Sequence, residues 1–260
     1  MPDFAPINFS TDLAGRVALV TGASSGLGWR FSQVLAACGA KVAVAGRRRE
    51  RLEALAAEIA SSGGVAFPVV MDVSQTRQIA SAVDAAEQAL GRVDILVNNA
   101  GLADAQLATK MSLEQTDQMF DTNLRGPWVL SNEVARRLIE AKAPGRIVNI
   151  SSMSAFVCSG NPPTALYSVT KAAVVRMTEC LAEEWAPFNI NVNAIAPGTF
   201  ATEMTNGMIE QIGDSFIKSF PRPRIGRPDQ LDSTLLYLVS PASDFITGTC
   251  VKADDAQLPR

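Results

Sequence analysis

Short apolar runs alternate with longer segments of helical periodicity along most of this chain. The runs bounded by turn residues predict strands at 16–20, 41–45, 65–70, 93–97, 146–150, 190–195 and 249–252. Helical patterns between them predict helices over 26–38, 48–61, 75–90, 114–141, 165–186, 203–218 and 229–239. Strands that alternate with helices indicate right-handed crossovers and a parallel sheet covered on both faces. The pattern therefore predicts an α/β fold, a doubly wound parallel sheet of about seven strands in a single domain over residues 1–260.

A glycine-rich turn joins the first predicted strand to the first predicted helix. The segment Thr21-Gly-Ala-Ser-Ser-Gly-Leu-Gly28 directly follows Val17-Ala-Leu-Val20. Its glycines allow a tight turn and let a pyrophosphate approach the free N–H groups of a helix N-terminus, where the helix dipole favours an anion. The spacing differs from the usual Gly-x-Gly-x-x-Gly dinucleotide fingerprint. A glycine-rich turn without a ligand is the alternative.

Tyr167 and Lys171 stand four residues apart in a segment that runs without Gly or Pro to Trp185, so we expect them to be neighbours on a helix. An ammonium beside a phenol favours the phenolate. Lys171 is therefore predicted to lower the pKa of Tyr167 from its ordinary value of about 10. A phenol with a lowered pKa can act as a general acid or base near neutral pH. Two residues of a solvated helix face are the alternative.

The glycine-rich turn and the later Tyr-x-x-x-Lys pair together resemble the short-chain dehydrogenase/reductase family. Further segments resemble the family and follow its order, namely Asn98-Asn-Ala-Gly101, Asp121-Thr-Asn-Leu-Arg-Gly126, Ile147-Val-Asn-Ile-Ser-Ser152 and Pro197-Gly-Thr-Phe-Ala-Thr202. The resemblance covers residues 12 to 257. It implies a Rossmann-like fold and hydride transfer between a nicotinamide cofactor and a carbonyl or alcohol carbon.

The resemblance also implies a role for each motif residue. Tyr167 would protonate the developing alkoxide, and Ser152 would hydrogen-bond the same oxygen. Lys171 would lower the pKa of Tyr167 and hold the nicotinamide ribose, while Asn123 would anchor a water that passes protons to Lys171. Together with Tyr167 and Lys171, the implied cofactor-binding residues are Gly22, Ser24, Ser25, Gly26, Leu27, Gly28, Arg47, Arg48, Asp72, Val73, Asn99, Ala100, Gly101, Pro197, Gly198, Thr199 and Thr202.

The catalytic serine could be either of two residues. Ser152 lies fifteen positions before Tyr167, two more than is usual in the family, and counting back the usual distance gives Ser154. We favour Ser152 because it directly follows a predicted strand, where the backbone position is fixed. An insertion in the loop, at Asn161-Pro-Pro-Thr164, would move nothing upstream of it.

The end of the second predicted strand bears on the choice of cofactor. Gly46 stands where NAD-type members of the family carry an aspartate, and Arg47 and Arg48 follow it. Guanidinium groups suit a 2′-phosphate, so we predict NADP(H), with NAD(H) as the alternative and Arg47 as the best single contact. An ordinary exposed basic cluster would explain the arginines without a ligand. Asp72 resembles the family's adenine contact, but it could equally cap the turn after Ser74.

The substrate is less readable. Residues 202–227 resemble the family's substrate-covering lid, and Met204, Met208, Ile212 and Phe216 form a helical stripe that could cover an apolar ketone or simply pack in the core. The sequence therefore predicts an oxidoreductase that interconverts a ketone or aldehyde and an alcohol. A 3-oxoacyl-[acyl-carrier-protein] reductase and a non-catalytic dinucleotide-binding scaffold are the alternatives.

Composition excludes several other classes. The chain has no histidine, so His-based catalytic triads and zinc sites are impossible, and we expect no metal centre. A net charge of −3 gives no electrostatic case for nucleic acid. No apolar run reaches the length of about 18 residues that a membrane span needs. Residues 1–15, which include a predicted tail at 1–12, lack a secretion signal, so the cytoplasm is expected. The family resemblance suggests a homotetramer or homodimer.

Overall fold

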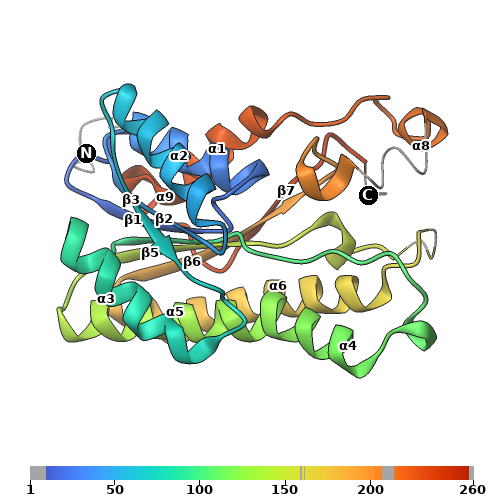
Figure 1. The fold of residues 1–260 in the computed structure, drawn as a ribbon, viewed down its shortest axis with the longest axis horizontal. Helices are drawn as coiled ribbons and strands as arrows, with labels where there is room; N and C mark the ends of the chain where they lie inside the picture. The colour runs from blue at the N-terminus through green and yellow to red at the C-terminus, as the bar shows by residue number, and fades with distance from the viewer. Residues whose placement is uncertain (1–9, 159, 161, 207–213, 258–260) are drawn as a thin grey trace, which may run out of the picture.

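The computed structural model of this protein describes residues 10–158, 160, 162–206 and 214–257. Within these residues a sheet of seven parallel strands has the order β3-β2-β1-β4-β5-β6-β7 (Figure 1). The strands are β1 (Val17–Thr21), β2 (Lys41–Gly46), β3 (Val65–Val70), β4 (Ile95–Asn98), β5 (Gly145–Ile150), β6 (Ile190–Pro197) and β7 (Cys250–Ala253). The predicted Rossmann-like, single-domain parallel sheet is confirmed.

Helices cover both faces of the sheet (Figure 1). One face carries α1 (Gly26–Ala37), α2 (Arg49–Ser61) and α9 (Asp232–Val239), and the other carries α3 (Ile79–Leu90), α5 (Gly126–Glu140) and α6 (Ala165–Trp185). The fully buried Phe31 and Leu235 belong to the first core, and Leu130 and Leu138 to the second. Among the described residues, no helix has both the length and the apolar character needed to cross a bilayer.

The predicted helix 114–141 is interrupted by a π-helical turn at Asp121–Arg125, which separates α4 (Leu113–Phe120) from α5. Pro127 has no N–H to donate to the carbonyl of Asn123, and its ring would crowd that carbonyl in a regular α-helix. In the wider turn the Gly126 N–H donates to the Asp121 carbonyl, five residues back. The wider turn therefore accommodates the proline without ending the helix.

The predicted helix 203–218 lies partly outside the described residues. Residues 203–206 are helical, and α8 (Asp214–Lys218) forms its far end. Met208 and Ile212 of the predicted stripe lie outside the described residues. The remaining predicted elements begin and end within a few residues of those observed.

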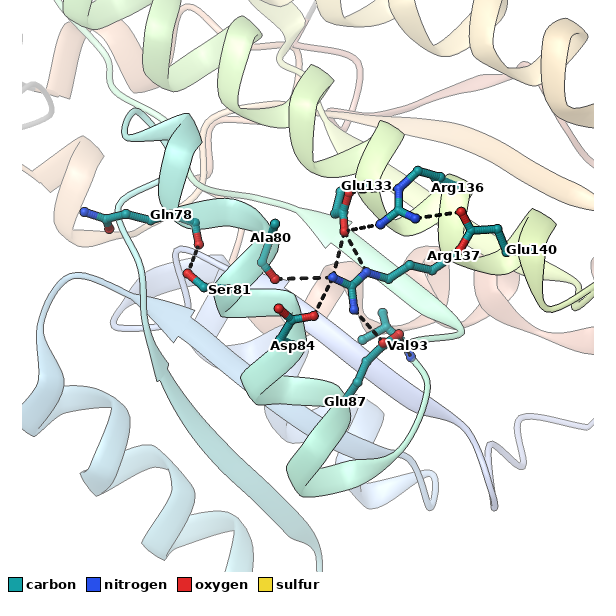
Figure 2. A network of polar contacts seen from close by, with 10 residues as sticks. All are labelled: Gln78, Ala80, Ser81, Asp84, Glu87, Val93, Glu133, Arg136, Arg137 and Glu140. Atoms are coloured by element: carbon teal, nitrogen blue, oxygen red, sulfur yellow. Dashed lines mark hydrogen bonds and ion pairs between the residues drawn. The ribbon is translucent and has the colours of Figure 1, made fainter.

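A network of ion pairs fixes α3 against α5 (Figure 2). The Arg137 guanidinium contacts the carboxylates of Asp84 and Glu87 on α3, at 2.7 and 2.9 Å, and that of Glu133 on its own helix, at 2.7 Å. These carboxylates raise the pKa of Arg137 further above its ordinary value, against the opposing effect of burial. Arg137 is only 17% exposed, so its pairs are better shielded from solvent than ordinary surface pairs. The network holds one helix layer in place beneath the sheet.

The strand order reverses between β1 and β4, because β1 pairs with β2 on one side and with β4 on the other. The connections that follow these two strands leave toward opposite parts of the sheet. Ligands of open parallel sheets bind at such a reversal, beyond the carboxyl ends of the strands.

Candidate active site

A cavity of about 270 Å³ opens beyond the carboxyl ends of the strands. It is lined by residues that follow β1, β2, β4, β5 and β6. The predicted residues that line it are Gly22, Ser24, Ser25, Gly26, Leu27, Arg47, Arg48, Asp72, Val73, Asn99, Ala100, Gly101, Ser152, Tyr167, Lys171, Pro197, Gly198 and Thr202. Gly28, Asn123 and Thr199 do not line it. The fold therefore brings segments that are far apart in the sequence to one cavity.

The glycine-rich turn leads into the start of α1 at one side of the cavity. Gly22 and Gly26 have positive φ angles of 65° and 56°, which side chains rarely adopt. A Cβ on Gly28 would lie 2.4 Å from the Gly22 carbonyl oxygen, so only glycine fits at this position in the observed turn. Within the described part of the chain, the Ser25 side chain makes no capping hydrogen bond to α1, and no acidic residue stands in the first turn of the helix. The N–H groups at the start of α1 therefore suit the pyrophosphate of a dinucleotide.

Thr21 and Asn99 tie this turn to the end of β4. The Thr21 hydroxyl accepts hydrogen bonds from the N–H groups of Asn99 and Ala100, both at 3.0 Å. The Asn99 side chain donates to the Thr21 carbonyl at 2.9 Å. The Thr-Gly motif and the Asn-Asn-Ala-Gly motif are therefore two halves of one hydrogen-bonded wall of the cavity.

Two arginines line the cavity after β2, and Arg48 makes more contacts than Arg47. Arg48 Nη2 donates to the hydroxyls of Ser24 and Ser25, at 3.0 and 2.9 Å, and pairs with Glu203 at 2.9 Å. Arg47 is exposed and makes no hydrogen bond or ion pair with any residue in the described ranges. The Arg47 guanidinium is therefore available to a ligand in the cavity. A ligand of Arg48 would have to compete with Ser24, Ser25 and Glu203.

Asp72 lines the cavity after β3, and its carboxylate is also part of a turn. Asp72 Oδ1 accepts hydrogen bonds from the N–H and the hydroxyl of Ser74, at 3.0 and 2.8 Å. The turn-capping alternative raised by the sequence is therefore present. It does not prevent an adenine contact, because the residue still faces the cavity.

Ser152, Tyr167 and Lys171 meet at the part of the cavity that follows β5. Ser152 is buried at the end of the strand, and its side chain hydrogen-bonds Tyr167. The Lys171 ammonium lies 5.7 Å from the centre of the Tyr167 ring and donates to the Ile150 carbonyl at 2.8 Å. Ser154 does not line the cavity, and its N–H donates to the Ser152 hydroxyl at 3.1 Å. The structure thus places Ser152, not Ser154, beside the tyrosine.

The predicted lowering of the Tyr167 pKa is wrong. Burial raises the pKa of Tyr167 above its ordinary value, and the Ser152 hydrogen bond opposes this only in part. Burial also lowers the pKa of Lys171 to about 8, which weakens the charge that was expected to act on the phenol. Helical spacing correctly made the two residues neighbours, but it could not show that both would lie in a poorly solvated site. A raised pKa keeps Tyr167 protonated near neutral pH and ready to donate a proton.

Asn123 lies on the π-helical turn, behind the cavity lining. Its Oδ1 accepts from the Leu102 N–H at 2.7 Å, and its Nδ2 donates to the Leu102 carbonyl at 2.9 Å and to the Thr170 hydroxyl at 3.2 Å. A Cβ on Gly101 would lie 3.4 Å from both Asn123 Oδ1 and Lys171 Nζ. Asn123 thus joins the segment after β4 to α6, next to the lysine.

The segment after β6 closes the remaining side of the cavity. Pro197, Gly198 and Thr202 line it, whereas the Thr199 N–H is held by Gln257 Oε1 at 2.7 Å. Gln257 lies beyond β7, and sequence reasoning did not find it. Gln257 does not line the cavity, and its hydrogen bond holds the segment after β6 in place.

Three lining residues come from the segment 202–227 that resembles the family's lid, namely Glu203, Met204 and Thr205. Further lining residues were not among those predicted, namely Ala45, Gly46, Met71, Leu102, Thr122, Ile150, Ser151 and Phe200. Most of them flank a motif or end a strand, so the rule that ligands bind beyond strand ends could have found them. Glu203 directly follows the motif residue Thr202, but nothing in the sequence indicates that it pairs with Arg48.

Comparisons with known proteins agree with this geometry. The chain matches the short chain dehydrogenase family model over residues 16–213. It is 37% identical over 240 residues to the 3-oxoacyl-[acyl-carrier-protein] reductase of Aquifex aeolicus, covering 92% of this chain and 96% of that protein. A short-chain type dehydrogenase/reductase from Mycobacterium marinum superposes with a TM-score of 0.91 at 35% identity, over 96% of this chain and 98% of that one. A gluconate 5-dehydrogenase from Burkholderia cenocepacia, in complex with NADP and tartrate, has a TM-score of 0.88 at 32% identity, over 94% and 96%.

Proposed function

This chain belongs to the short-chain dehydrogenase/reductase family and is an NAD(P)-dependent oxidoreductase, and on that premise we propose that it interconverts ketones or aldehydes and alcohols with a preference for NADP(H). The observation that carries the proposal is that one cavity contains both the Ser152, Tyr167 and Lys171 group and the two arginines after β2. Strands β2 and β5 are three positions apart in the sheet, roughly 14 Å. An extended dinucleotide can therefore lie between the two groups, with its pyrophosphate at the start of α1.

The side chains after β5 and on α6 divide the chemistry between them. The bound cofactor supplies or accepts the hydride at its nicotinamide ring. In the direction of reduction, Tyr167 holds a proton on its hydroxyl and donates it to the substrate oxygen. The Ser152 hydroxyl donates a hydrogen bond to the same oxygen and orients it. By resemblance to the family, Lys171 would bind the nicotinamide ribose, and Asn123 would anchor a water for the proton path to Lys171.

The preference for NADP(H) rests on the end of β2. Gly46 leaves no carboxylate there to bind the adenosine ribose, and Arg47 presents a guanidinium without a partner among the described residues. Guanidinium groups bind phosphate oxygens by charge and by paired N–H groups. The complex of the gluconate 5-dehydrogenase with NADP supports this choice for a protein of the same fold.

Exchanging Arg47 for aspartate tests the cofactor preference. Arg47→Asp should shift the ratio of kcat/KM for NADPH to that for NADH at least about tenfold toward NADH, because the substitution removes a phosphate ligand and repels the phosphate. Steady-state rates with both cofactors, over a panel of ketones, aldehydes and alcohols, measure the ratio. Arg49→Asp is the matched control, since Arg49 pairs with Glu53 and does not line the cavity. An unchanged ratio in Arg47→Asp would show that Arg47 does not bind the phosphate.

Alanine substitution tests the choice of serine. Ser152→Ala should lower kcat by about 10²-fold, the cost of losing one hydrogen-bond donor to the reacting oxygen. Ser154→Ala should leave kcat nearly unchanged, because Ser154 lies outside the cavity lining. Turnover of one ketone by both variants, at saturating NADPH, decides between them. A larger loss in Ser154→Ala would reverse the assignment.

A 3-oxoacyl-[acyl-carrier-protein] reductase remains the second candidate, because the Aquifex aeolicus relative has that name. Activity on an acyl-carrier-protein thioester far above that on simple ketones would favour it.

A non-catalytic scaffold is disfavoured by the complete group of Ser152, Tyr167 and Lys171. Binding of NADPH without oxidoreduction over the whole panel would revive it. A cytoplasmic location and a homotetramer or homodimer stay predictions.

A further inference from the structure

Glu203 and Arg48, which both line the cavity, form an ion pair. Arg48 Nη1 contacts Glu203 Oε1 at 3.0 Å, and Nη2 contacts Oε2 at 2.9 Å, so the pair is bidentate. The two residues are 155 positions apart in the sequence, on the connection after β2 and on the helical residues 203–206. Both line the cavity. The pair therefore spans the site proposed for the adenosine end of the cofactor.

The Arg48 guanidinium has no nitrogen without a partner. Its Nε donates to the Ser24 hydroxyl at 3.2 Å, and Nη2 donates to the hydroxyls of Ser24 and Ser25 as well as to Glu203. A planar guanidinium offers its N–H donors in a fixed geometry, and here Glu203 occupies the Nη1/Nη2 edge while Ser24 occupies the Nε/Nη2 edge. A phosphate group can bind the Nη1/Nη2 edge only where the carboxylate of Glu203 withdraws.

The carboxylate of Glu203 is an anion at any working pH. Arg48 lowers its pKa to about 2, with a further contribution from the Ser25 hydroxyl. The Glu203 side chain is 53% exposed, and that of Arg48 is 45% exposed. Exposed ion pairs contribute little to folding stability. Loss of the Glu203 charge should therefore alter ligand binding more than it alters the fold.

We propose that Glu203 is a specificity-determining residue, whose carboxylate competes with the cofactor's 2′-phosphate for Arg48 and so moderates the preference for NADP(H). The inference rests on the proposed function. NADH, which has no 2′-phosphate, leaves the Arg48–Glu203 pair intact. NADPH must displace Glu203 from Arg48, while Arg47 has no such competitor among the described residues. Arg47 can then bind the 2′-phosphate directly, whereas Arg48 can bind it only after Glu203 has been displaced.

Equilibrium binding to the full-length protein tests the competition without turnover. Glu203→Gln keeps the shape of the side chain and removes its charge. It should tighten the Kd for NADPH about two- to fivefold, the range expected for one exposed ion pair, and leave the Kd for NADH unchanged. Adenosine 2′,5′-bisphosphate should gain affinity likewise, and adenosine 5′-monophosphate should not. Calorimetry or ligand fluorescence gives these constants. Glu53→Gln, which removes a carboxylate from the Arg49 pair outside the cavity, should change none of them.

Three results would overturn the inference. An unchanged ratio of NADPH to NADH affinity in Glu203→Gln, in a protein that binds and turns over both, would remove Glu203 from cofactor selection and leave the proposed function intact. A wild-type protein that binds neither dinucleotide would overturn the proposed function along with the inference. The Arg48→Gln variant tests whether Glu203 acts through Arg48. In that background Glu203→Gln should not tighten the Kd for NADPH any further. A tightening equal to that in the wild-type background would show that Glu203 does not act through Arg48.

Discussion

Replacing Tyr167 by phenylalanine should abolish turnover while the protein still binds NADPH. The substitution removes only the hydroxyl, so the apolar contacts of the ring remain. Loss of a positioned general acid costs roughly 10²–10⁴-fold in kcat. Single-turnover rates with a ketone from the panel measure the loss, and a fluorescence titration with NADPH measures the Kd, which should stay within about twofold.

The chain offers a matched control for this substitution. It contains two tyrosines, and the other one, Tyr237, is exposed on α9. Tyr237→Phe should therefore keep wild-type turnover. Retention of catalysis by Tyr167→Phe would refute the assignment of Tyr167 as the proton donor, and a parallel loss of NADPH binding would show that the hydroxyl serves the cofactor instead.

Replacing Lys171 by methionine should stabilise the protein while it inactivates the enzyme. Lys171 is 5% exposed, and burial lowers its pKa from the ordinary 10.5 to about 8. Holding this charge in a poorly solvated site costs folding free energy, although the Ile150 carbonyl offsets part of the cost. We expect the free energy of unfolding at pH 7 to rise by about 1–3 kcal/mol in Lys171→Met. Turnover should fall about 10²-fold or more, because the proton path and the ribose contact are both lost.

The pH dependence of stability gives this prediction a signature of its own. Between pH 8 and 10.5 the unfolded chain binds the Lys171 proton and the folded chain does not, so the stability of the wild type rises with pH in this window. The advantage of Lys171→Met should therefore shrink from pH 8 upward and vanish near pH 10.5. Denaturant unfolding at several pH values follows the difference. Lys110→Met, at an exposed lysine, is the control and should show no such trend. A difference that stays constant with pH would contradict the assignment.

The fold was predictable because the apolar runs, the helical periodicity and the turn residues all indicated the same arrangement of strands and helices. The buried strands are short apolar runs, the helices carry periodic apolar positions, and the turns contain glycine where a positive φ is needed, as at Gly22. The π-helical turn before Pro127 was missed because helical periodicity alone predicts one unbroken helix over 114–141 and does not distinguish an α-turn from a π-turn. The turn is visible only in the backbone, where the Gly126 N–H donates to the Asp121 carbonyl five residues back.

The candidate site was predictable where it consists of local motifs. The Thr-Gly turn and the Tyr-x-x-x-Lys pair reach the cavity because strand ends and helical spacing position them. The sign of the Tyr167 pKa shift was not predictable, because burial is a property of the whole fold. Glu203 was missed for a related reason, since its partner Arg48 comes from a distant connection. Motif spacing therefore found the residues, and three-dimensional packing decided their electrostatics.

The hydrogen bond between Gln257 and Thr199 separates the shape of the cavity from the stability of the core. The Gln257 amide oxygen accepts from the Thr199 N–H, although Gln257 lies beyond β7 and belongs to neither apolar core. A change at this position would therefore leave the core packing complete and act on the wall of the cavity next to Gly198. Thermal stability is for this reason a poor guide to the effect of substitutions at Gln257.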